Sequence, residues 1–355
     1  MTTVGTCDLS SHGYTVQQWI GHCFDGAGDI FLGRCNDSAR VAIKRIPLDA
    51  LDITYDPSRA ESSGDNTRTL VHAKAPDKGQ LLREDIRLMR LLRHPHIVDF
   101  HACFVDGLSI YLVLGSCNYG SASDVILSSY QCGIPEKAIA LILRQLLSAL
   151  VYLHAQQIIH RSIRASHILL DSAGGVRLTG FRLARKLRPG ETTTTDFDNH
   201  VEASLLWLAP EVLGQDLSGY STRADIYSVG TTLCEMANGF PPFGDMNRLE
   251  MLYEKSRGTT PRLLDSTTLP PYEEPSEHST RTFSEAFHSI TGLCLKVDPA
   301  NRPDANSLLS HPFLKKTKKT FSDLMPLAQT LDQIQRVSGK KDTTPEPQRV
   351  PEWVF

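Results

Sequence analysis

The chain has 355 residues with near-average shares of hydrophobic (41%) and charged (22%) side chains, which is typical of soluble globular proteins. This composition excludes collagen-like, mucin-like and wholly disordered chains. The 37 lysines and arginines against 40 aspartates and glutamates give a formal charge of −3, which gives no reason to expect bulk binding of nucleic acid.

The cysteine pattern and the apolar stretches bear on the compartment. The eight cysteines form no C-x-x-C pair, so neither a zinc knuckle nor a redox motif is predicted. The N-terminus lacks the apolar region of a signal peptide, and Arg144 interrupts the most apolar stretch, residues 138–153. We therefore expect a soluble cytoplasmic protein with no membrane or nucleic-acid partner. The lysine-rich residues 315–319 would also suit nuclear import, although a solvated helix end has the same composition.

The first third of the chain is predicted to be rich in β-structure. Residues 30–35 and 40–46 have the Val- and Ile-rich pattern of β-strands. Residues 49–79 are polar and poor in apolar side chains, which predicts a flexible insertion between this pair and the next element.

A helix and two more strands are predicted after the insertion. The apolar residues of 80–94 have helical spacing, and Pro95 then stops the helix. Residues 97–106 and 109–114 have the composition of two further strands. The first third therefore predicts a small β-rich lobe with one helix.

The pattern changes to that of helices after Pro135. Apolar residues follow on one wide helical face: Ile139, Ile142, Leu143, Leu146, Leu147, Leu150 and Val151. A second long helix is predicted to begin near Thr222, with Asp225 placed as in a capping box, and to end at Gly239. The tail from residue 315 is lysine-rich and then rich in Pro, Thr and charge, which predicts an extended segment.

The motifs of the chain, taken in order, resemble those of a eukaryotic protein kinase. VAIK ends at Lys44, HRSIRASH spans 160–167, GFR spans 180–182 and APE spans 209–211, followed by DIYSVG and NRP. The resemblance implies a bilobal α+β fold over residues 14–314. It places an N-terminal segment at 1–13, a small lobe to about 117 that holds the insertion 49–79, a large lobe at 118–314 and a tail at 315–355.

The residues that carry phosphoryl transfer in kinases differ here. Ser162 replaces the catalytic-loop aspartate, and a hydroxyl cannot usefully accept the substrate proton. His167 replaces the metal-binding asparagine, and Gly180 replaces the metal-binding aspartate of D-F-G. With three losses at one site we expect no catalysis and no metal site. A slow kinase in which another residue compensates is the enzymatic alternative.

The glycine-rich loop is altered, but the strand lysine is retained. Gly21, Cys23 and Gly26 stand where G-x-G-x-x-G is expected, and a Cβ at position 23 hinders the close approach of a phosphate. Gly28 stands where a valine over the nucleotide base is usual. Lys44 is expected to contact phosphate; a surface lysine is the alternative. Its usual glutamate partner is replaced by Asp85, which is one methylene shorter.

Two arginines are additions to the kinase pattern. Arg164 stands in the position of the catalytic-loop lysine, and Arg182 replaces the glycine of D-F-G. Guanidinium groups can balance a triphosphate in place of a metal, so we expect ATP to bind without Mg²⁺. Alternatively, both arginines face solvent or pair with nearby carboxylates. The resemblance adds Ala42, Cys117, His167 and Leu169 to the nucleotide-binding residues.

Among the kinases, the chain resembles the STE20-related adaptor pseudokinases. HRSIRASHILL, WLAPEVL, NYGSASDVI, DIYSVGTTLCEMANGFPPFGDM and the terminal WVF carry this resemblance. It implies ATP binding, allosteric activation of a serine/threonine kinase of the liver kinase B type, and assembly with a helical-repeat scaffold of the mouse protein twenty-five type. Trp353 and Phe355 match the family's scaffold anchor, whereas Val354 departs from it. An accidental apolar terminus is the alternative, as is a scaffold protein that binds no nucleotide.

The same resemblance assigns structural roles. His160 and Phe181 belong to the family's hydrophobic column, and Asp225 caps the backbone of the catalytic loop. Glu211 and Arg302 form a buried ion pair. Thr192–Thr195 lie in the segment that kinases phosphorylate, although a flexible polar loop would have the same composition. The sequence thus predicts a kinase shape that is retained for binding.

Overall fold

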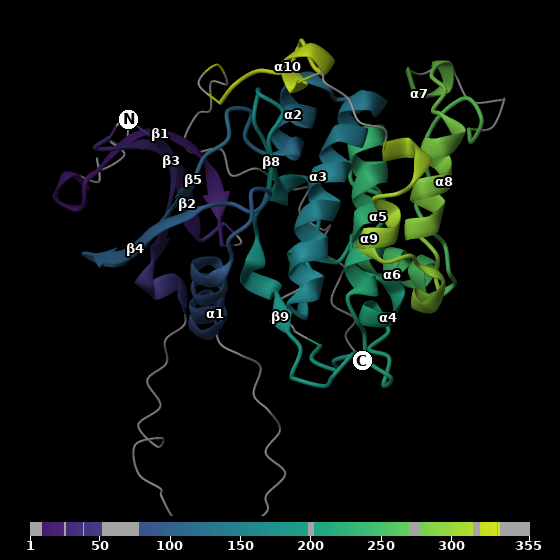
Figure 1. The fold of residues 1–355 in the computed structure, drawn as a ribbon, viewed down its shortest axis with the longest axis horizontal. Coiled ribbons are helices and arrows are strands. Elements are labelled where there is room, and N and C mark those ends of the chain that lie inside the picture. The colour runs from purple at the N-terminus through teal and green to yellow at the C-terminus, as the bar shows by residue number, and fades with distance from the viewer. Residues whose placement is uncertain are drawn as a thin grey trace, which may run out of the picture. The chain divides into compact units, whose positions relative to one another are not determined.

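The computed structural model describes residues 9–24, 26–37, 39–51, 78–197, 202–269, 277–314, 320–331 and 333. Two compact units are present: a β-rich unit of residues 1–91 and 100–115, and a helical unit of residues 92–99 and 116–355 (Figure 1). They are described separately. Most of the predicted insertion 49–79, the lysines of 315–319 and the terminal WVF lie outside the described residues.

The β-rich unit contains a five-stranded antiparallel sheet in the order β1-β2-β3-β5-β4. Its strands are β1 Tyr14–Cys23, β2 Gly28–Cys35, β3 Arg40–Pro47, β4 Phe100–Asp106 and β5 Ser109–Gly115. Helix α1, Lys78–Leu91, follows the insertion and ends before Pro95, as predicted. Strand β1 has no counterpart in the predictions, because none of its ten residues is fully buried and its sequence shows no apolar alternation.

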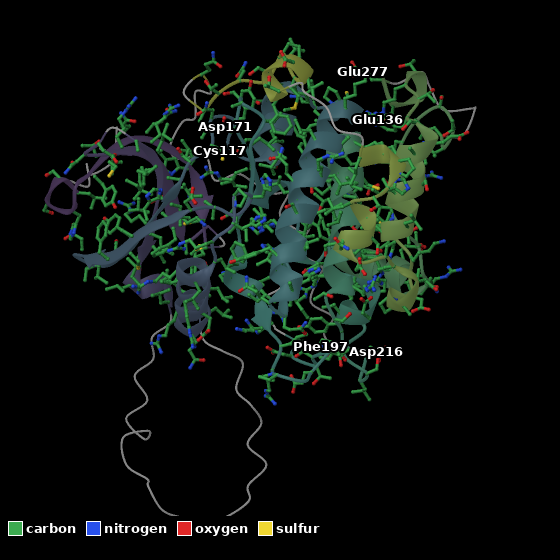
Figure 2. The ribbon with its side chains drawn as sticks, viewed as in Figure 1. Cys117, Glu136, Asp171, Phe197, Asp216 and Glu277 are labelled. Carbon is green, nitrogen blue, oxygen red and sulfur yellow. The ribbon has the colours of Figure 1, made fainter. Side chains whose placement is uncertain are left out.

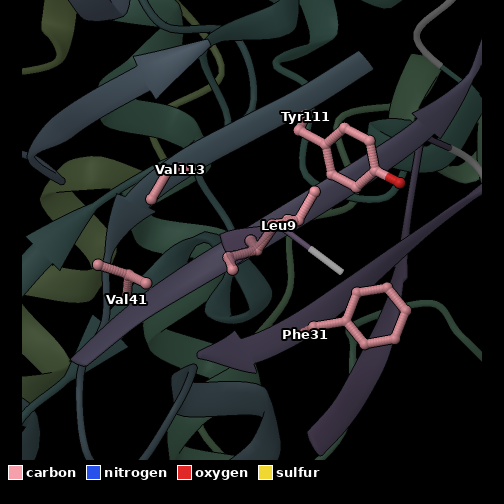
Figure 3. Packing of buried hydrophobic residues seen from close by; sticks show 6 residues of the cluster. Leu9, Phe31, Val41, Tyr111 and Val113 are labelled. Carbon is pink, nitrogen blue, oxygen red and sulfur yellow. The ribbon is translucent and has the colours of Figure 1, made fainter. Parts of the chain in front are cut away.

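One face of this sheet carries an apolar cluster that holds the strands together. Phe31, Val41, Ile43, Tyr111 and Val113 come from β2, β3 and β5, and all are at most 4% exposed (Figure 3). Leu9 joins them from the segment that precedes β1, ahead of a short 3-10 helix, Ser10–His12. Burial of a large aliphatic or aromatic side chain contributes about 1.5–3 kcal/mol, so this cluster stabilises the sheet that carries Lys44.

The helical unit is built around α3, Glu136–Ala155, and α5, Arg223–Asn238. Every residue of α5 after Arg223 is buried. The other helices are α2 Ala122–Ser129, α4 Pro210–Leu213, α6 Arg248–Ser256, α7 Glu277–Thr280, α8 Glu285–Cys294, α9 Ala305–Leu308 and α10 Phe321–Leu324. Two small antiparallel pairs complete the unit: β6 Ile158–Ile159 with β9 Arg185–Lys186, and β7 Ile168–Leu170 with β8 Val176–Leu178.

Helix α3 is the one described helix that is long and apolar enough to cross a membrane. Length and composition are its only resemblance to a membrane span. It packs against α5, α9 and β8, and half of its most apolar window is buried in the unit, as in the core helix of a soluble protein.

The ends of α5 confirm one prediction and correct another. Gly239 ends the helix with a positive φ of 91°, as expected of a glycine C-cap. The capping box predicted between Thr222 and Asp225 does not form, because the Thr222 side chain makes no capping hydrogen bond. The Asp225 carboxylate is used by the catalytic loop instead, where it accepts from the backbone of His160 and Arg161.

Residues 320–331 correct the prediction of an extended tail from residue 315. A Thr320–Asp323 capping box begins α10, and Phe321, Met325 and Leu331 are at most 5% exposed. Leu331 N donates to Asn118 O over 2.8 Å, in the segment that follows Cys117. This C-terminal strap, residues 320–331, is therefore part of the folded unit, because its spaced apolar residues find a surface that only the tertiary structure provides.

Candidate functional site

Lys44 lies in the middle of the sheet of the β-rich unit. In β3 it stands opposite Ile30 of β2 and Leu112 of β5, and its side chain is partly buried. Asp85 lies on α1 and is 9% exposed.

The altered glycine-rich loop has a physical explanation at Gly28. Cys23 ends β1 opposite Gly28, and its Sγ lies 3.5 Å from Asp29 O. A Cβ added to Gly28 would meet Arg45 O at 2.7 Å and Cys23 Sγ at 2.9 Å, closer than real Cβ contacts. Gly28 is therefore required where kinases usually carry valine, because Cys23 and the β3 backbone fill the space. Gly26 has φ 85° with open space around it, a left-handed conformation that glycine adopts without strain.

Asp225 fixes the start of the catalytic loop in the helical unit. It is fully buried and accepts from His160 N over 2.9 Å, from Arg161 N over 2.8 Å and from His154 over 2.9 Å. Burial alone would raise the pKa of Asp225, but the hydrogen bonds from His154 and the His160 backbone outweigh burial and lower it. The His160 ring packs edge-on against Phe181 at 4.8 Å, and both residues are buried.

Ser162 occupies the catalytic position but is held by other protein groups. It is 3% exposed, and its Oγ lies 2.8 Å from Ser204 Oγ and 3.2 Å from His167 Nδ1. Ser204 is 1% exposed. A buried hydroxyl in this network carries no negative charge near neutral pH, so it cannot replace a carboxylate as proton acceptor.

The His167 ring is oriented by two fixed partners. Its Nδ1 lies 2.7 Å from Ser162 O, which can only accept, so Nδ1 carries the proton. Its Nε2 lies 3.3 Å from Arg164 Nη2, which can only donate, so Nε2 accepts. This pattern assigns the neutral imidazole with the proton on Nδ1. The nitrogen lone pair that could bind a metal is therefore already used by Arg164.

Gly180 and His167 are physically linked. Gly180 has φ 88°, and a Cβ there would meet the imidazole Nδ1, Cγ and Cε1 at 2.5–2.7 Å. The ring thus takes the space from which a D-F-G aspartate would extend. Mg²⁺ requires oxygen ligands, and Ser162, His167 and Gly180 supply no carboxylate, so these residues do not fit the metal of active kinases. Within the described part of the chain, no cluster of three His, Cys, Asp or Glu side chains could hold a metal ion.

Arg164 is held within the loop. Its Nη1 donates to Ala203 O over 2.5 Å, and its guanidinium lies 5.6 Å from the centre of the Trp207 ring. Arg182 is partly buried in the 3-10 helix Phe181–Leu183. Arg164 lies between Ser162 and His167 in the sequence, and Arg182 is the second residue after Gly180. These contacts of Arg164 are with a backbone carbonyl, the His167 ring and the Trp207 ring, so they decide neither for a phosphate contact nor for pairing with a carboxylate.

Glu235 is a site residue that the sequence predictions missed. This carboxylate on α5 is 5% exposed and accepts from Ala165 N over 2.9 Å and from Trp207 Nε1 over 2.7 Å. Burial raises the pKa of Glu235 to about 7. A charged residue inside the apolar run TTLCEM was the available signal. Glu235 joins the catalytic loop to the segment before APE.

The remaining predicted nucleotide-binding residues divide between the units. Gly21, Cys23, Gly26, Ala42 and Lys44 belong to the β-rich unit, and Cys117, Arg164, His167, Leu169 and Arg182 belong to the helical unit. Cys117, labelled in Figure 2, is 4% exposed, and Leu169 lies in β7. Their joint role in nucleotide binding stays a prediction.

Comparison with known proteins identifies relatives that match most of the chain. The protein kinase domain family matches residues 67–314. STE20-related kinase adapter protein strd-1 of Caenorhabditis elegans is 37% identical over 320 residues, covering 87% of this chain and 76% of that protein. Adapter protein alpha of Gallus gallus is 37% identical over 297 residues (75% and 76%), and adapter protein beta of Mus musculus is 31% identical over 355 residues (90% and 80%). These relatives are named adapters rather than kinases.

Proposed function

The chain belongs to the protein kinase family and, within it, to the STE20-related kinase adapters, and from this membership we propose that it is a catalytically inactive adaptor that binds ATP. The observation that carries the proposal is the packing of the His167 ring against Gly180, where an added Cβ would lie 2.5–2.7 Å from ring atoms. Restoring the lost carboxylate would require the imidazole to move. The kinase shape is kept, whereas the position of a metal ligand is filled by protein.

ATP is proposed to bind without needing Mg²⁺. The positive groups available are Lys44 on β3 and the two arginines Arg164 and Arg182. Charge-assisted hydrogen bonds from guanidinium groups can balance phosphate charge as a metal does. Arg164 would have to exchange its bond to Ala203 O for a phosphate oxygen, so its contribution depends on that rearrangement.

The proposed activity is allosteric activation of a serine/threonine kinase of the liver kinase B type. A surface that binds the active conformation of the partner more tightly than the inactive one shifts the partner's equilibrium toward activity. A helical-repeat scaffold of the mouse protein twenty-five type would bind the terminal Trp353 and Phe355, as two aromatic anchors on one peptide. ATP would stabilise the competent shape of the adaptor through linkage.

Nucleotide binding is tested by calorimetric titration of the full chain with ATP in EDTA. We expect binding in EDTA, and we expect Lys44→Met, Arg164→Met and Arg182→Met each to weaken it about ten-fold or more, because each removes a charged hydrogen-bond donor. Arg188→Met is the control, since the Arg188 side chain is 86% exposed. Absence of binding by the parent chain would reject the pocket, and unchanged affinity of a variant would reject that residue's role.

The partner role is tested by reconstitution. The full chain should raise the activity of a liver kinase B-type kinase in the presence of the scaffold, and deletion of residues 353–355 should weaken capture of the scaffold. An unaltered pull-down after the deletion would reject the terminal anchor. A partner kinase equally active with and without the chain would reject the adaptor function itself.

A further inference from the structure

In the segment between GFR and APE, residues Leu183 and Asp196 are both bound by one buried arginine. Arg161 is 3% exposed and adopts a positive φ of 63°. Its Nε donates to Leu183 O over 2.6 Å, and its Nη1 donates to Asp196 O over 2.8 Å and to Tyr220 OH over 2.6 Å. Arg161 therefore joins the first and last parts of the segment 183–196 to the loop that precedes α5.

A second set of contacts links the same residues to one another and to Tyr220. Asp196 Oδ2 accepts from Arg185 Nε over 2.5 Å, and the Tyr220 hydroxyl donates to Asp196 O over 2.6 Å. Thr194 and Tyr220 exchange two backbone hydrogen bonds of 2.9 Å each. The Phe197 ring packs on Tyr220 with centroids 5.5 Å apart. We call Arg161, Leu183, Arg185, Asp196 and Tyr220 the clasp.

In the clasp, groups of this chain pair with arginine side chains, as a phosphate does in many kinases. Activation segments are commonly ordered when a phosphorylated side chain pairs with arginine side chains. Here the chain itself supplies the acceptors, because Arg161 is engaged by two carbonyls and a hydroxyl, and Arg185 is paired with a carboxylate. We propose that Asp196 is a positioning residue that orders the segment 183–197 in place of a phosphate. Residues 183–197 are then ordered without modification, a property beyond the proposed adaptor function.

The neighbouring threonines fit this assignment. Thr193 and Thr195 are exposed, while Thr194 is partly buried and its Oγ1 accepts from Asp196 N over 3.2 Å. Gly219 has φ 81°, and an added Cβ would lie 2.7 Å from Thr194 O. The backbone next to Tyr220 therefore lies so close to Thr194 that only glycine fits at position 219. The order of the segment follows from backbone contacts and one carboxylate, and no phosphate on Thr192–Thr195 is required.

The test is limited trypsin digestion of the full chain after phosphatase treatment, with loss of phosphate verified by mass spectrometry. Trypsin cuts after Lys186, an exposed residue inside the segment. Asp196→Asn removes the charge and keeps the shape. Asp216→Asn is the control, an exposed carboxylate labelled in Figure 2. Cleavage after Lys186 should be about three- to five-fold faster in Asp196→Asn than in the parent, since a partly exposed ion pair is lost and local opening rises.

The outcomes are read from cleavage alone, so failure here is distinct from failure of ATP or partner binding. Support requires fast cleavage in Asp196→Asn, parent rates in Asp216→Asn, and no effect of phosphatase on the parent. Equal rates in the two variants, or faster cleavage of the parent after phosphatase, overturn the proposal. Tyr220→Phe provides a second variant: it removes the hydroxyl that bridges Arg161 and Asp196 O, and an unchanged cleavage rate would likewise count against the clasp.

Discussion

Replacing Gly180 by alanine tests whether the missing carboxylate and the histidine are linked. Gly180 has φ 88°, and a Cβ there would lie 2.5 Å from His167 Nδ1. The left-handed conformation should destabilise a non-glycine residue by about 1–2 kcal/mol, and the overlap with the ring should add about 1–3 kcal/mol. We therefore expect Gly180→Ala to lower the free energy of unfolding by about 2–5 kcal/mol.

Two comparisons separate the backbone from the steric contribution. Gly190 has φ 86° with nothing within 4 Å of an added Cβ, so Gly190→Ala should lose only about 1–2 kcal/mol. In a His167→Ala background the overlap is gone, so the cost of Gly180→Ala should fall by about 1–3 kcal/mol. Urea unfolding of the four chains of this double-mutant cycle, with Gly190→Ala alongside, gives these values. The reasoning is refuted if Gly180→Ala costs no more than Gly190→Ala, or costs the same with and without the imidazole.

Three further outcomes are expected in the helical unit. The buried Arg302 guanidinium donates to both Glu211 carboxylate oxygens, over 2.7 and 2.8 Å. Glu211→Gln removes the counter-charge and should lower the free energy of unfolding by about 3–5 kcal/mol. A loss below about 1 kcal/mol in urea unfolding would contradict this. Phe321→Ala should lower the free energy of unfolding by about 3–5 kcal/mol, because it leaves a cavity beneath the C-terminal strap. Leu327 in the same strap is 69% exposed, so Leu327→Ala should change stability by less than about 0.5 kcal/mol. Equal effects of the two variants in thermal unfolding would show that the strap is not packed. Burial lowers the pKa of Lys255 from its ordinary 10.5 to about 7, so between these values the unfolded chain binds more protons and stability from this lysine rises with pH, by up to about 1.4 kcal/mol per pH unit. Lys255→Met should lack that rise between pH 7 and 9, and an identical pH dependence in the two chains would remove Lys255 as its source.

The elements with strong local patterns could be predicted from the sequence. The strand-like runs predicted β2 to β5, and the helical apolar spacing predicted α1, α3 and α5. Gly239 predicted the end of α5. The structure confirms these elements and this helix end. Strand β1 could not be predicted in the same way, because its residues are half-buried and mixed in polarity. The Asp225 capping box failed because tertiary hydrogen bonds to the backbone of residues 160 and 161 are available to this carboxylate in the folded unit.

In the site, too, residue types could be predicted from the sequence, whereas contacts between distant residues could not. Loss of the catalytic and metal-binding side chains at Ser162, His167 and Gly180 can be read directly from residue types. The contact between the imidazole and Gly180 depends on a turn that places residues 13 positions apart against each other, and no local pattern indicates it. Glu235 and Ala165 are 70 residues apart, and Asp196 and Arg161 are 35 apart. Such pairs become visible only when α5 and the catalytic loop are packed.

The central claim is that this kinase fold does not carry out phosphoryl transfer. The most direct measurement is the rate of phosphate transfer from ATP by the purified full chain, with Mg²⁺ or Mn²⁺, to itself and to a general protein substrate. We expect no transfer above that of the Lys44→Met variant, because no carboxylate is present at positions 162 and 180. Metal-dependent turnover that Lys44→Met abolishes would contradict the account.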